Sequence, residues 1–161
     1  MPRTRVSRVI AASPQAVYDA MLDPRAVARW KVPDGMAGEV HEWEPRVGGR
    51  LRVSLTYGPQ LAGEAAARGK TSAGTDTYEG RFLELVPGRR VVEAISFETD
   101  RAEMRGEMTV VTTLTPLPGA TAVEIDHSGL PDGVVEADNR TGTEMALAKL
   151  AALLERAEPG R

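Results

Sequence analysis

A short segment toward the C-terminal end, EIDHS, places two carboxylates and a histidine within four positions: Glu124, Asp126 and His127. Such a group could transfer protons or bind a metal ion. Alternate side chains of a β-strand point to opposite faces, so Val123, Ile125 and His127 face the core while the two carboxylates face solvent. We therefore expect only His127 of the three to face the interior. It is either a strand-end histidine bonded to a backbone carbonyl or water, or a donor or general acid/base at the rim of a pocket.

The other reactive residues form no catalytic pattern. His41 is the second of two histidines. Neither an HxxxH nor an HExxH spacing occurs, so we expect no metal site. The absence of cysteine excludes disulfides and thiolate ligands. No glycine-rich nucleotide loop or serine nucleophile elbow is present, and we expect no cofactor. Glu84 could also transfer protons, but an inward-facing Glu84 needs a partner such as Arg52 or His127.

A second group of residues has side chains suited to a ligand pocket. Tryptophan and tyrosine combine an apolar ring with a polar atom, and methionine adapts its shape to its surroundings. Each of these residues either fills the core or lines a pocket, and the sequence leaves both alternatives open. The candidate ligand-binding residues are Trp30, Trp43, Tyr57, Tyr78, Met108, Val110, Thr112, Ile125, His127 and Met145.

Length and composition describe a single domain, 1–161. The 20 basic and 23 acidic residues give a net charge of -3, which favours neither nucleic acid nor an anionic membrane as a partner. No apolar stretch approaches the roughly 18 residues of a membrane span, and the apolar run at the N-terminus is too short for a signal peptide. We therefore expect a cytoplasmic protein.

The elements that position these residues follow in a simple order. Residues 4–12 are rich in β-branched side chains and predict a strand. The Ser-Pro pair at 13–14 and the Asp-Pro pair at 23–24 are each typical of a helix start, so two short helices run to about Trp30. Alternating apolar and polar residues separated by turns then predict six strands: 38–43, 50–57, 76–85, 90–98, 106–115 and 121–128.

Alternation also assigns faces within two of these strands. In GEVHEW it places His41 and Trp43 on the face opposite to Val40. In DTYEGRFLEL it places Phe82 and Glu84 on one face, but apolar residues occur on both faces, so the buried face stays open. The orientation of Glu84 therefore needs a structure.

A long helix is predicted near the end of the chain. Asp138 and Asn139 offer N-cap oxygens. A proline-glycine pair ends the helix and leaves 158–161 as a tail. Residues 58–74 are small, polar and glycine-rich, which predicts a mobile loop, either a lid or a hairpin tip. The helix carries a broad apolar stripe made by Met145, Leu147, Leu150, Leu153 and Leu154.

These elements predict an α+β fold in which a curved antiparallel sheet of about seven strands wraps around the long C-terminal helix, with two short helices after the first strand. Five segments of the chain also carry a resemblance to a known family: SPQAVYDAMLDPRAVARW, EWEPRVGGRLRVSL, TYEGRFLELVPGRRVV, TAVEIDHSGLP and NRTGTEMALAKLAALLE. In order and spacing they resemble the START-like, helix-grip superfamily (SRPBCC). Within it they resemble the AHSA-like proteins, which are related to the C-terminal domain of the activator of the heat-shock chaperone ATPase. The resemblance covers almost the whole chain.

The resemblance implies a cavity between the sheet and the long helix. Relatives bind lipids, hormones or polyketides there, and a few cyclise or dehydrate aromatic polyketides. The first function hypothesis is therefore a module that binds a small, largely apolar molecule. The second is an enzyme of the aromatase/cyclase kind, in which His127 and Glu84 transfer protons. The third is a chaperone-binding module, since fold alone does not decide function.

Two departures from the relatives bear on these hypotheses. Many relatives carry Gly-Trp early in the last helix, where this chain has Gly142 and Thr143, and loss of the indole implies either more room or less stacking at that position. The eukaryotic chaperone activator has a second, N-terminal domain, for which we expect no room in this chain, and this expectation argues against chaperone activation. The sequence leaves open a homodimer through a sheet edge.

Overall fold

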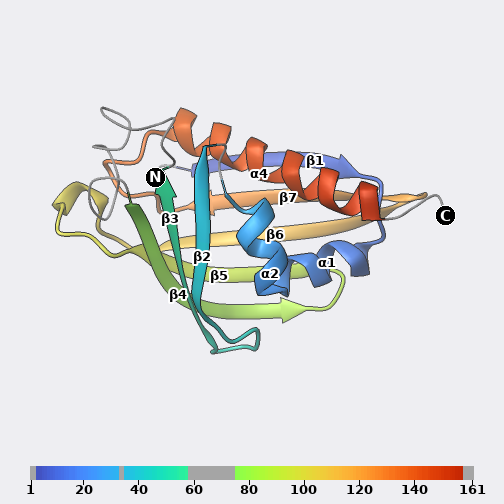
Figure 1. Ribbon diagram of the computed structural model, residues 1–161, viewed down its shortest axis with the longest axis horizontal. Coiled ribbons are helices and arrows are strands. Elements are labelled where there is room, and N and C mark those ends of the chain that lie inside the picture. The colour runs from blue at the N-terminus through green and yellow to red at the C-terminus, as the bar shows by residue number, and fades with distance from the viewer. Residues whose placement is uncertain (1–2, 33–34, 58–74, 158–161) are drawn as a thin grey trace.

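The computed structural model describes residues 3–32, 35–57 and 75–157. The described residues form one seven-stranded antiparallel sheet with the strand order β1-β7-β6-β5-β4-β3-β2, and α4 lies across one face of this sheet (Figure 1). The α+β fold and the order of its elements agree with the prediction. The elements are β1 (Arg3–Ile10), α1 (Pro14–Leu22), α2 (Pro24–Trp30), β2 (Met36–Trp43), β3 (Arg50–Tyr57), β4 (Thr75–Val86), β5 (Arg90–Phe97), η2 (Ala102–Met104), β6 (Met108–Leu117), β7 (Ala120–Ser128) and α4 (Glu136–Ala157).

The two short helices begin where their capping residues predict. The Ser13 hydroxyl accepts a hydrogen bond from the Ala16 amide at 3.1 Å, and the Asp23 carboxylate accepts one from the Arg25 amide at 2.9 Å. Each contact satisfies an amide that the first turn of a helix leaves without an intrahelical partner. Asp23 both ends α1 and caps α2, so the chain turns there. Trp30, the last residue of α2, is buried in the core at 3% exposure.

Helix α4 packs against β1, α1 and α2 through its apolar stripe. Leu147 and Leu150 are fully buried, and Leu153 and Leu154 are partly buried against the same core. The helix begins at Glu136, earlier than predicted. The predicted N-caps Asp138 and Asn139 are therefore both wrong, because both residues lie within the first turns of the helix. The Asn139 side chain instead accepts a hydrogen bond from the Thr4 hydroxyl.

A β-bulge in β2 corrects the predicted faces around His41. The register shifts between Val40 and Glu42, so Val40 and Trp43 both face the core and His41 lies exposed on the outer face. The extra residue of a bulge reverses the alternation beyond it, which simple period-two counting misses. The His41 ring contacts the Ser54 hydroxyl at 2.8 Å on that outer face.

A second bulge, in β4, settles the orientation of Glu84. Phe82 is buried at 1% exposure, so its face is the inner one, but the register shifts between Phe82 and Glu84. Glu84 is exposed and accepts a hydrogen bond from Arg90 at 2.9 Å. The predicted partners Arg52 and His127 are therefore wrong, as is a role for Glu84 inside the pocket.

The remaining predicted segments are short turns and ends. Gly88 and Gly119 turn the β4–β5 and β6–β7 hairpins with φ values of +71° and +68°, which glycine adopts without strain. The short helix η2 was not predicted, because three residues carry no periodicity. The predicted loop at 58–74 and the tail at 158–161 lie outside the described residues.

Candidate functional site

A pocket of about 690 Å³ lies between the inner face of the sheet and α4. Side chains from α2, η2 and several strands, β4 to β7 among them, complete its wall. Val135, at 57% exposure, and Asp138 line it beside the start of α4, so the pocket opens to solvent there. Its size falls within the range of roughly 300–1,000 Å³ that is common for small-molecule sites.

Most of the predicted ligand-binding residues come together in this wall. Met108 and Val110 are each 2% exposed, and they supply an apolar floor beside Ile125. Met145 reaches the pocket from α4 and Trp30 from α2. The predicted residues that line the pocket are Trp30, Tyr78, Met108, Val110, Thr112, Ile125, His127 and Met145.

One predicted residue, Trp43, is not part of the pocket wall among the described residues. Trp43 packs edge-on against Phe82, with ring centroids 5.3 Å apart, and its indole N–H donates to the Leu22 carbonyl at 2.7 Å. This places Trp43 among the packing residues that join β2, β4 and α1. The side chain of Tyr57 lies outside the described part of the chain.

Sequence reasoning missed an ion pair inside the pocket. Lys31 Nζ lies 3.3 Å and 3.5 Å from the two carboxylate oxygens of Glu93. The Glu93 side chain is 7% exposed and that of Lys31 is 24% exposed. Both residues line the pocket, so the pair presents a buried carboxylate and a partly open ammonium to its interior.

The pair and Tyr78 influence one another electrostatically. Burial lowers the pKa of Lys31, but the charges of Glu93 and Tyr78 and the hydrogen bond to Glu93 raise it by more, so the net shift is upward. Burial raises the pKa of Tyr78, which the nearby ammonium opposes and the Glu93 carboxylate reinforces. At neutral pH Lys31 is therefore charged and Tyr78 is a neutral phenol.

His127 faces the pocket, as strand alternation predicts, and has unusual surroundings. Its Nδ1 atom is buried without a hydrogen-bond partner among the described residues. Burial, reinforced by the Lys31 charge and opposed by Asp126, lowers the pKa of His127 to about 4. The ring is therefore neutral at pH 7 and presents one N–H donor and one acceptor nitrogen. The predicted bond from this histidine to a backbone carbonyl is not formed at Nδ1.

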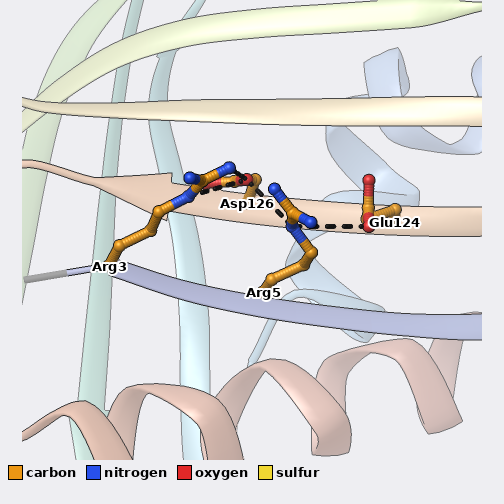
Figure 2. Close-up of polar contacts among 4 residues, drawn as sticks. All are labelled: Arg3, Arg5, Glu124 and Asp126. Carbon is orange, nitrogen blue, oxygen red and sulfur yellow. Dashed lines mark hydrogen bonds and ion pairs between the residues drawn. The ribbon is translucent and has the colours of Figure 1, made fainter.

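The neighbouring carboxylates lie on the other face of β7, as predicted (Figure 2). Arg3 donates to Asp126 at 2.5 Å and Arg5 lies 3.3 Å from the same carboxylate. The hydrogen bond from Arg3, and then that from Arg5, lower the pKa of Asp126. Arg5 also lies 3.5 Å from Glu124. Glu124 and Asp126 are thus paired with arginines and take no part in the pocket.

The register of the sheet places Glu93 and His127 on one row. Glu93 is paired with Val110 across β5 and β6, and Val110 is paired with His127 across β6 and β7. Neighbouring strands lie about 4.8 Å apart, so the Cα atoms of Glu93 and His127 are separated by roughly 10 Å, with Val110 between them. The arrangement can bind a polar group of a ligand above an apolar floor.

A signal for Glu93 is present in the sequence. In RVVEAISF, alternation places Glu93 on the same face as Val91 and Ile95, and a carboxylate within an apolar face requires a partner. Lys31 gives no comparable signal, because its position depends on how the chain leaves α2.

The described residues contain neither a metal-binding cluster nor a membrane-spanning helix. Within residues 3–32, 35–57 and 75–157, no group of three or more histidine and carboxylate side chains has the proximity that a metal ion needs. None of the helices in the described ranges combines the length and apolar character of a membrane span.

Fold and site together define an α+β protein in which a long helix encloses a pocket against an antiparallel sheet. Residues 11–155 match the family described as Activator of Hsp90 ATPase homolog 1-like protein. The chain belongs to this family, which confirms the resemblance seen in the sequence segments. No curated protein matches the chain.

Solved structures support the same assignment. Protein CV1439 from Chromobacterium violaceum is 34% identical, with a TM-score of 0.82 over 96% of this chain and 97% of that one. A protein from Rhodobacter sphaeroides is 23% identical, with a TM-score of 0.77 over 98% and 94% of the two chains. The AHSA1 protein from Silicibacter pomeroyi is 21% identical, with a TM-score of 0.76 over 97% and 99%. The last two show the fold alone.

Proposed function

We propose that this protein binds a small, largely apolar molecule in the pocket between the sheet and α4. The observation that carries the proposal is the composition of the pocket wall. A floor of Met108, Val110 and Ile125 offers apolar area, while Lys31 and His127 supply a few polar atoms. Ligand sites are commonly apolar with a small number of polar groups that fix orientation.

Blocking the pocket provides a direct test. Thr143 lines the pocket at 8% exposure, whereas the next residue, Glu144, is exposed and does not line it. A Thr143→Trp variant places an indole in the pocket, and Glu144→Trp adds the same indole outside it. We expect N-phenyl-1-naphthylamine, an uncharged fluorescent probe, to bind the wild type and Glu144→Trp but at least tenfold more weakly to Thr143→Trp. Equal affinity for all three folded proteins contradicts pocket binding.

Native mass spectrometry of the freshly purified chain provides an independent test. The proposal predicts a bound small molecule on the wild type that is absent from Thr143→Trp. Consistently empty wild-type protein together with co-purification of a chaperone would instead support the chaperone-binding hypothesis, which the family description also suggests.

A second candidate function, acid/base catalysis on a bound polyketide-like molecule, is favoured by one observation. His127 lines the pocket and is neutral at pH 7, so its unprotonated ring nitrogen can accept a proton from a ligand. Glu84 no longer contributes to this candidate because it lies on the exterior. Turnover of an aromatic polyketide that is lost in His127→Ala, with binding retained, supports catalysis. Binding without turnover in the wild type contradicts it.

A further inference from the structure

The polar groups of the pocket narrow the chemistry of the ligand, provided that the proposed function holds. Among the described residues, the charged side chains that line the pocket are nearly balanced. An anionic ligand therefore meets no excess of positive charge. The two cations are Lys31 and Arg101, and the three anions are Asp76, Glu93 and Asp138.

Lys31 has capacity to bind a ligand oxygen. An ammonium carries three N–H donors, and the contacts of Lys31 with Glu93, at 3.3 Å and 3.5 Å, are longer than the roughly 2.8 Å of a strong charged hydrogen bond. The side chain keeps 24% of its surface exposed at the pocket wall. A ligand oxygen can therefore accept a hydrogen bond from Lys31 without breaking the ion pair.

His127 offers the complementary partner on the same row of the sheet. Its Nδ1 is buried and unpaired among the described residues, and a buried polar atom without a partner is destabilising. Rotation about the bond between Cβ and the ring is soft, so either ring nitrogen can turn toward the pocket. A group that both accepts from Lys31 and donates to the unprotonated nitrogen of His127 would satisfy both residues.

We propose that the ligand is uncharged and carries a hydroxyl on an apolar body, and that this hydroxyl accepts a hydrogen bond from Lys31 and donates one to His127 above Val110. A carboxylate has no proton to donate, and it would lie close to the Glu93 carboxylate. A ketone or ester can accept from Lys31 but cannot donate to His127. An alcohol or phenol meets both requirements.

Three probes with one shared ring system test this assignment by calorimetry: naphthalene, 2-naphthol and 2-naphthoate. We expect 2-naphthol to bind the wild type about tenfold more tightly than naphthalene, since hydrogen bonds to charged and buried groups contribute roughly 1.5 kcal/mol. We expect 2-naphthoate to bind no more tightly than naphthalene.

Two independent variants locate the contacts. In His127→Phe, and in the double variant Lys31→Met with Glu93→Gln, the preference for 2-naphthol over naphthalene should fall to about twofold or less. The double variant avoids leaving Glu93 buried without a counter-charge, and it serves as the test if His127→Phe does not fold. Met145→Ala is the matched control, because it trims the apolar wall and should weaken both probes while keeping their ratio.

The outcomes separate this inference from the proposed function. A 2-naphthol preference that survives in both variants, or tighter binding of 2-naphthoate, overturns the hydroxyl assignment and leaves the pocket as a binding site. Equal affinity of the wild type for naphthalene and 2-naphthol also overturns the hydroxyl assignment and leaves the pocket as a binding site. No binding of any probe, together with an empty protein in native mass spectrometry, contradicts both.

Discussion

Asp126 and His127 are neighbours in β7, yet they lie in opposite surroundings. Asp126 points outward and is bound by Arg3 and Arg5, which lower its pKa. His127 points inward, keeps an unpaired nitrogen among the described residues, and has a pKa lowered to about 4 by burial. The outer face thus satisfies its polar groups with its own side chains. The inner face leaves polar groups incompletely satisfied beside a pocket.

This difference distinguishes polar groups that stabilise the fold from polar groups that can bind a ligand. A polar group that is fully paired within the protein adds little affinity for a ligand, whereas one that is buried and unpaired gains a partner when a ligand binds. Changes on the inner face should therefore alter stability and binding strongly, and changes on the outer face should alter both weakly. The predictions below are ordered by the size of the expected effect.

The largest effect is expected where the helix meets the inner face. Leu150 is completely buried, at 0% exposure, whereas Leu154 is only partly buried. Leu150→Ala should lower the free energy of unfolding by about 2–5 kcal/mol, because it leaves a cavity under α4. Urea unfolding measures this, with Leu154→Ala as the matched control and a smaller expected loss. Equal effects of the two substitutions would show that α4 is not anchored as described.

Removing Lys31 should have the next largest effect. Lys31→Met leaves the Glu93 carboxylate, only 7% exposed, without its counter-charge. We expect the free energy of unfolding to fall by about 3 kcal/mol, and to recover partly when Glu93→Gln is added. If the single variant unfolds at the same urea concentration as the wild type, the ion pair does not hold α2 to β5.

The lowered pKa of His127 predicts a defined dependence of the free energy of unfolding on pH. Its folded-state pKa of about 4 lies below the usual 6.5, so below pH 6.5 the unfolded chain takes up a proton that the folded chain does not. Stability is unaffected by this group above about pH 7, and falls by about 2 kcal/mol between pH 7.5 and pH 5. The pKa of Asp126 is lowered as well, and the stability that this carboxylate contributes is lost only below this interval of pH.

The His127→Gln variant isolates this contribution. It should lose about 2 kcal/mol less than the wild type over the same interval of pH, as measured by urea unfolding at each pH. Parallel curves for the two proteins would mean that His127 titrates near its ordinary pKa and is not buried as described.

The smallest effect is expected on the outer face. The Arg5 side chain is 55% exposed, and Asp126 keeps its contact with Arg3 when Arg5 is removed. Arg5→Ala should lower the free energy of unfolding by less than about 1 kcal/mol, and by less still at high salt. A loss as large as that of Lys31→Met would contradict the distinction between the two faces.

The fold was predictable because its signals are local. The capping residues Ser13 and Asp23 place the two short helices, and alternation in β7 orients His127 correctly from sequence alone. These signals depend on a few neighbouring residues, so they survive without knowledge of tertiary structure.

The errors arose where one extra residue reverses the alternation. The bulges before Glu42 and Glu84 place Trp43 on the inner face and Glu84 on the outer face, and a bulge leaves no clear mark in a single sequence. The ion pair was missed for a different reason. Alternation in β5 places Glu93 on an apolar face, which is a usable signal, but its partner Lys31 lies far away in the chain and is brought near only by the path of α2.

The two histidines of the chain allow the comparison between faces to be measured in one experiment. His41 lies on the outer face and His127 in the pocket. Nitrogen chemical shifts of both rings can be followed by NMR while 2-naphthol is added to the wild type at neutral pH. The account predicts that the His127 nitrogens shift and saturate with the calorimetric affinity while those of His41 stay unchanged. Saturable binding that leaves His127 unperturbed, or that moves His41 alone, would contradict it.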